Sequence, residues 1–115
     1  MKIKLFTSHV SKEELLELAQ DSYVDMVKGV VDLKKRVLAL GGELHADAEQ
    51  ILLDQGSKQE DLWGFNIFID KNRDEYLEYK SMINIRPKQG NRDREVKDIN
   101  LRNQIKSMID AMVQL

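Results

Sequence analysis

The segment 62–69 has the clearest strand pattern in the chain and constrains the fold more than any other stretch. Its side chains alternate, so that Trp63 and Phe65 share one face with the two isoleucines that follow. Such alternation is typical of a β-strand that packs one face against a core. A second alternating run at 76–86 follows a charged turn. We therefore expect an antiparallel hairpin that ends at Pro87, because proline cannot donate to a strand ladder.

Three further segments favour strands. The segment 2–7 alternates, and the β-rich runs 27–33 and 36–40 flank a polar turn, which predicts a second hairpin. Gly29 marks either a bulge or close packing within the first of these runs. The apolar residues 38–40 do not alternate, which indicates a strand covered on both faces.

Helical spacing of apolar residues distinguishes three other segments. We expect helices over 12–25, over 47–55 and from Asp98 onward. Ser11 and Glu14 match the capping-box pattern before the first helix. Asp47 and Gln50 form a similar pair at the start of the second, and Asp98 is a favourable N-cap for the third.

These elements give the order βαββαββα for the whole chain. Two hairpins imply a mainly antiparallel five-stranded sheet, and three helices with one apolar stripe each are expected to pack on one of its faces. The sequence thus predicts a two-layer α+β domain. No repeat or linker composition divides it, so we expect a single domain over residues 1–115.

Composition excludes several classes of protein. The chain has no cysteine, which rules out disulfides, thiolate metal sites and cysteine nucleophiles. No apolar run approaches the roughly 18 residues of a membrane span, and the basic N-terminus lacks the features of a signal peptide. We therefore expect a soluble, cytoplasmic protein with no membrane role. Its net charge is −2, so any binding of nucleic acid would need a local basic patch.

The first candidate site is the segment 41–49, which contains two glycines, a histidine and three carboxylates. His45, Glu43 and Asp47 are the candidate catalytic residues, because an imidazole beside carboxylates can act as a general base. Together with Glu49 they are also the candidate ligands of a divalent metal, the one cofactor that the sequence suggests. The alternative is structural: the same acidic side chains would stabilise the start of a helix, because the N-terminal end of a helix dipole is positive.

The second candidate site is the loop 84–94, which concentrates four basic groups around one glycine. Arginine binds phosphate or carboxylate through two parallel hydrogen bonds, and glycine lets the backbone approach a ligand closely. The candidate ligand-binding residues are Asn84, Arg86, Gln89, Asn91 and Arg92. In the alternative interpretation the loop is only solvated, and its charges pair with the neighbouring acids.

Three segments of the chain are distinctive: Gly-Gly-Glu-Leu-His-Ala-Asp at 41–47, Gln-Gly-Ser-Lys-Gln-Glu-Asp-Leu-Trp-Gly at 55–64 and Ile-Asn-Ile-Arg-Pro-Lys-Gln-Gly-Asn-Arg at 83–92. Together they resemble a small family of uncharacterised prokaryotic proteins. The resemblance extends over nearly the whole chain. It implies a stand-alone domain of unknown function, and it brings no activity, cofactor or catalytic residue with it.

Two functional hypotheses follow. The first is a binding or interaction module with a polar, anion-binding pocket between the Gly41–Glu49 turn and the Arg86–Arg94 loop. Its partner would be an anionic small molecule, a protein or, with weaker support, nucleic acid. The second is a small metal-dependent or acid–base hydrolase of a phosphoester or nucleic acid, in which the loop arginines stabilise developing negative charge. The second hypothesis requires the two segments to lie side by side.

Overall fold

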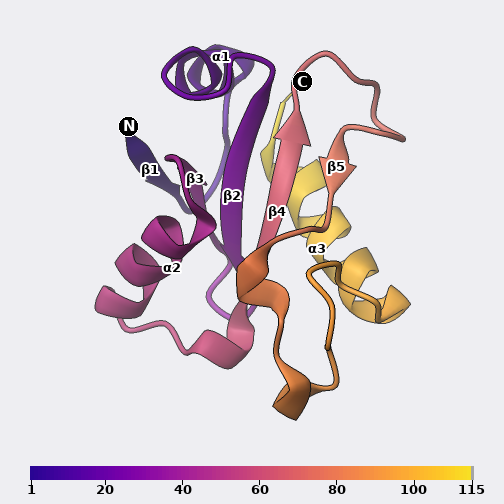
Figure 1. Cartoon of the computed structure of the whole chain (residues 1–115). Helices are drawn as coiled ribbons and strands as arrows, with labels where there is room; N and C mark the ends of the chain where they lie inside the picture. The colour runs from indigo at the N-terminus through magenta and orange to yellow at the C-terminus, as the bar shows by residue number, and fades with distance from the viewer. Residues whose placement is uncertain (115) are drawn as a thin grey trace.

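Five strands form one antiparallel sheet in the computed structural model, which describes residues 1–114 (Figure 1). The strands are β1 Ile3–Phe6, β2 Met26–Asp32, β3 Val37–Gly41, β4 Leu62–Phe68 and β5 Leu77–Glu78. Their order across the sheet is β1-β3-β2-β4-β5, and every neighbouring pair is antiparallel. The expected five-stranded α+β fold and the element order βαββαββα are confirmed.

Three helices accompany the sheet: α1 Lys12–Gln20, α2 His45–Asp54 and α3 Ile99–Met112. The predicted capping box of Ser11 and Glu14 opens α1, and the Asp98 side chain accepts the first amides of α3. None of the helices within residues 1–114 is long and apolar enough to cross a membrane.

The start of α2 differs from the prediction. The helix begins at His45, two residues before Asp47, and its N-cap is Leu44, which makes no side-chain cap bond. The expected cap formed by Asp47 is therefore wrong. Gly41 and Gly42 both have positive φ, so the chain turns immediately after β3 and enters the helix early. Asp47 then lies in the first turn, where its negative charge interacts favourably with the positive end of the helix dipole.

The helices cover both faces of the sheet, so the domain has three layers and the expected two-layer arrangement is wrong. Leu38 and Leu40 of β3 belong to the larger core, which contains the buried side chains of α1 and α3. Ala39 between them belongs to a smaller core on the opposite face, with Ala48 and Leu52 of α2. The apolar run 38–40 correctly predicted a strand covered on both faces. The apolar side of α2 packs on the second face of the sheet, because α1 and α3 already cover the first face.

Gly29 allows β2 and β4 to pack closely. It lies directly opposite Phe65 in the sheet, and a Cβ atom at Gly29 would be 2.4 Å from the Cζ atom of Phe65. The close packing that the sequence left open at this position is therefore present. The absence of a side chain lets the Phe65 ring lie across the strand and remain fully buried.

The predicted strand 76–86 is mostly wrong, since β5 contains only Leu77 and Glu78. Side chains form the hydrogen bonds that a longer strand would have made through its backbone. The Ser81 hydroxyl accepts the Ile83 amide, and the Asn84 carboxamide bonds to both the N–H and the C=O of Gly64 in β4. Side-chain bonds of this kind compete with strand ladders, so the chain turns instead of continuing along the sheet.

Candidate functional site

A cleft of about 430 Å³ lies between the first turn of α2 and the segment 80–83. Lys28 of β2 and Asn66 of β4 are paired across the sheet and therefore point to the face that α2 covers. They line the cleft together with His45 and Arg94. The apolar part of the lining comes from Leu44, Ala46, Met82 and Ile83.

His45 is buried in the cleft, and a hydrogen bond fixes which of its ring nitrogens carries the hydrogen. Only 7% of the residue is exposed, and its Nε2 atom lies 2.8 Å from the carbonyl oxygen of Phe65. Because a carbonyl can only accept, Nε2 carries the hydrogen. Burial lowers the pKa of His45, the Phe65 carbonyl partly opposes this, and the charge of Lys28 lowers the pKa further. The ring is therefore neutral near pH 7, and Nδ1 is an acceptor.

Asn66 contributes a second acceptor at the base of the cleft. Its Nδ2 atom donates to Glu78 Oε1 at 2.8 Å and to the Lys80 carbonyl at 3.2 Å. Both partners accept hydrogen bonds, so they fix the orientation of the carboxamide. The opposite atom, Oδ1, is buried and has no hydrogen-bond partner among residues 1–114. A buried acceptor without a hydrogen bond lowers the stability of the fold, so this atom is a place where a donor could bind.

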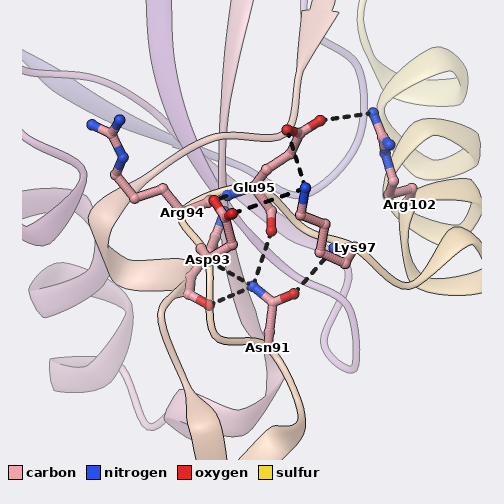
Figure 2. A network of polar contacts seen from close by, with 7 residues as sticks. Asn91, Asp93, Arg94, Glu95, Lys97 and Arg102 are labelled. Carbon is pink, nitrogen blue, oxygen red and sulfur yellow. Dashed lines mark hydrogen bonds and ion pairs between the residues drawn. The ribbon is translucent and has the colours of Figure 1, made fainter.

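Three cations surround these two acceptors. Lys28 is half-buried, whereas Lys80 and Arg94 are exposed. Within the described chain none of the three takes part in an ion pair, and no carboxylate lines the cleft. The Arg94 side chain extends away from the polar network of its own loop, as Figure 2 shows. The lining itself thus carries positive charge and no carboxylate, and the nearby carboxylate of Glu78 is held beside it by Asn66.

The polar groups of Asn84 and Arg86, two predicted ligand-binding residues, are engaged in the fold. The guanidinium of Arg86 lies 4.1 Å from the centre of the Trp63 ring and donates to the carbonyls of Gln59, Leu62 and Ile83. The Asn84 carboxamide also donates to the Arg94 carbonyl, beyond its bonds to Gly64. Burial lowers the pKa of Arg86, and the charge of Glu49 opposes this effect.

Asn91 organises the other end of the same loop (Figure 2). Its Nδ2 atom donates to the carbonyls of Asn84, Asp93 and Glu95, while its Oδ1 atom accepts the Lys97 amide. Every polar atom of this carboxamide therefore has a partner.

The remaining predicted residues of the loop lie on its outside. Gln89 is exposed and ties the loop to the Glu60 carbonyl. Arg92 is exposed and does not line the cleft. Arg94 is the residue of this loop that reaches the cleft.

The predicted metal ligands do not come together. Glu43 and Asp47 are exposed, while Glu49 is half-buried one turn along α2 from His45. Among residues 1–114 no group of three or more histidine, aspartate or glutamate side chains is placed to hold a metal ion. The two predicted segments do lie side by side, because Glu49 is close enough to act on the charge of Arg86 and His45 shares the cleft with Arg94.

Sequence reasoning missed Lys28, Asn66 and Lys80 as lining residues. The available signal was that Lys28 and Asn66 interrupt two apolar strands. An isolated polar residue on a strand indicates a functional position only when its neighbour on the next strand is known. That neighbour depends on the pairing of β2 with β4, whose residues are 30 or more positions apart in sequence.

Comparisons with curated proteins and with solved structures find no match for this chain. A family model described as "Protein of unknown function (DUF5674)" matches residues 4–112. The matched region contains every residue of the cleft and nearly all of the sheet. The expected resemblance to a family of unknown function is confirmed, and the chain belongs to the DUF5674 family.

Proposed function

We propose that this protein is a binding module for a small organic anion, held in the cleft between α2 and the segment 80–83. The observation that carries the proposal is the set of three cations, Lys28, Lys80 and Arg94, around a cleft that no carboxylate lines. Like charges gathered at one place repel each other, and a bound anion relieves that repulsion. The volume, about 430 Å³, falls within the range of small-molecule sites.

The apolar residues of the cleft specify the rest of the ligand. Leu44 is 55% exposed and Met82 is 68% exposed, and both line the cleft. Covering such side chains is favourable by roughly 25 cal/mol per Å² of apolar surface. A ligand with an apolar body beside its anionic group uses both parts of the lining. Inorganic phosphate or sulfate would contact only the cations.

Binding is favoured over hydrolysis because the two acids that were predicted to act with His45 lie outside the cleft. Glu43 and Asp47 are exposed and do not line the cleft. His45 lines it with an unprotonated Nδ1 atom, but neither of these acids is beside it. The cations are thus positioned to hold an anion, and we propose no reaction for it.

Calorimetric titration with a matched series of ligands tests the proposal. Benzenesulfonate has an apolar ring and a permanent negative charge, methanesulfonate keeps the charge alone, and benzenesulfonamide keeps the ring alone. We expect benzenesulfonate to bind most tightly. Replacing Arg94 with alanine is expected to weaken its binding about tenfold, because a charge-assisted hydrogen bond contributes about 1.5 kcal/mol or more.

Arg92→Ala is the matched control. It removes the same charge from the same loop, but Arg92 is exposed and outside the cleft, so this variant should bind benzenesulfonate as the wild type does. The proposal fails if benzenesulfonate does not bind, or if the two arginine variants lose affinity equally. Equal loss would mean that only the general charge of the loop matters.

A further inference from the structure

The base of the cleft has two acceptors and lacks one donor. Nε2 of His45 keeps its hydrogen because it faces the Phe65 carbonyl, so in the neutral ring Nδ1 is bare. The Asn66 carboxamide is held by Glu78 and by the Lys80 carbonyl, so it cannot turn its amino group towards the histidine. Its Oδ1 atom is left buried without a partner.

One proton resolves this arrangement. If Nδ1 of His45 gains a hydrogen, the imidazolium ring can donate from both nitrogens, to the Phe65 carbonyl and to Asn66 Oδ1. The carboxamide of Asn66 favours the charged ring in this way and raises the pKa of His45. The buried acceptor then has its donor, which removes an unfavourable contribution to the free energy of the folded protein.

The neighbouring charges decide when that proton binds. Lys28 on β2 lowers the pKa of His45, and Glu78 on β5 raises it. Lys80 and Arg94 add positive charge across the cleft. In the free protein burial and the charge of Lys28 keep the ring neutral. An anion in the cleft would neutralise the cations and add a negative charge beside the ring, and both effects favour imidazolium.

We propose that anion binding in this cleft takes up one proton from solution at Nδ1 of His45, which then donates to Asn66 Oδ1. This inference rests on the proposed function and deepens it, since it makes the protein a binder whose affinity rises with acidity. The bound anion meets four positive groups: Lys28, His45, Lys80 and Arg94. The proton comes from the solvent and not from the ligand, so the bound anion keeps its full negative charge.

Calorimetry at fixed pH in two buffers of different ionisation enthalpy measures the proton uptake directly. Benzenesulfonate is the probe, since its own charge does not change over the range used. We expect net uptake of protons on binding near pH 7, and roughly threefold or more tighter binding at pH 6 than at pH 8. His45→Gln can still donate to the Phe65 carbonyl but cannot take up a proton, so its affinity should be independent of pH.

His9→Gln is the matched control, because His9 is the other histidine of the chain and is exposed. It should retain the proton uptake of the wild type. A second measurement needs no variant of His45. In proton NMR of the wild-type protein, benzenesulfonate should raise the pKa of one imidazole. The signal of that imidazole should still be present in His9→Gln, which would assign it to His45.

The outcomes separate this inference from the function on which it rests. Binding of benzenesulfonate without proton uptake, and with an unchanged imidazole pKa, overturns the coupling and leaves the binding function intact. Proton uptake that disappears in His9→Gln also overturns it. If benzenesulfonate does not bind to the wild-type protein at all, both proposals fall.

Discussion

The buried position of His45 should make the stability of the free protein depend on pH. Burial lowers the pKa of His45 below its ordinary value of 6.5. In the unfolded chain the ring titrates near 6.5, so at lower pH the unfolded state binds a proton that the folded state binds less readily. Stability therefore falls as the pH decreases through this range, down to the folded-state pKa.

We predict that His45→Gln loses less stability than the wild type between about pH 7.5 and pH 5.5. Urea unfolding at several pH values measures this, and His9→Gln should follow the wild-type curve. Parallel curves for all three proteins would show that His45 is not the residue responsible. A stability that increased towards pH 5.5 through His45 would contradict the direction of its pKa shift.

Gly29 is a residue at which a single methyl group should disrupt the packing of the sheet. Phe65 and Leu40 fill the space beside Gly29. A new Cβ atom there would lie 2.4 Å from the Cζ atom of Phe65 and 2.8 Å from the Cδ2 atom of Leu40. We predict that Gly29→Ala lowers the free energy of unfolding by about 2 kcal/mol, as overpacking of a core does.

Gly90→Ala is a useful comparison in the same urea experiment. It also adds a methyl group to a glycine, but no atom lies within 4 Å of that position, and only the positive φ of 80° opposes it. Its loss should be about 1 kcal/mol. If Gly29→Ala were the milder change, the close packing of β2 on β4 would be disproved.

Between β5 and α3 the chain forms two short 3-10 helices, Met82–Asn84 and Pro87–Gln89, and side chains fix this segment against the sheet. Arg86 joins this segment to the start of β4 through the carbonyls of Gln59 and Leu62, donates to the Ile83 carbonyl within its own segment, and stacks on Trp63. Lysine has a compact charge and cannot reproduce several fixed bonds and a planar stack at once. We predict that Arg86→Lys destabilises the protein by about 2 kcal/mol or more.

Trp63 is the only tryptophan of the chain and reports on this change directly. Its fluorescence should shift to the red in Arg86→Lys, because the indole ring loses its cover. Arg92→Lys makes the same exchange at an exposed position and should leave both stability and fluorescence unchanged. An Arg86→Lys variant with wild-type stability would mean that the guanidinium does not tie the segment to the sheet.

Elements with local signals were predictable from the sequence, and elements with distant partners were not. Ser11 and Asp98 cap helices through amides two or three residues away, so their signals are complete in a short window. The alternation of 76–86 predicted a strand, but Asn84 bonds to Gly64, 20 residues away. The short run 38–40 predicted burial on both faces, yet it could not say which helix covers which face.

The candidate site shows the same division for the molecule as a whole. The sequence predicted an anion-binding pocket between the 41–49 turn and the 86–94 loop, and the cleft is lined by His45 and Arg94 from those segments. Lys28 and Asn66 join them through the pairing of β2 with β4. The sequence contains no local signal for that pairing. The proposed site is therefore a product of the tertiary structure, in which five separate segments supply Lys28, His45, Asn66, Lys80 and Arg94.

Mapping benzenesulfonate onto the protein by amide chemical-shift changes tests the proposed site most directly. A spectrum of the nitrogen-15-labelled protein is recorded during titration with the ligand. We predict that the largest changes fall on the first turn of α2, on Asn66 and on the segment 80–83, and that Arg94→Ala reduces them. Saturable changes centred elsewhere in the protein, or no saturable change at all, would contradict an anion site in this cleft.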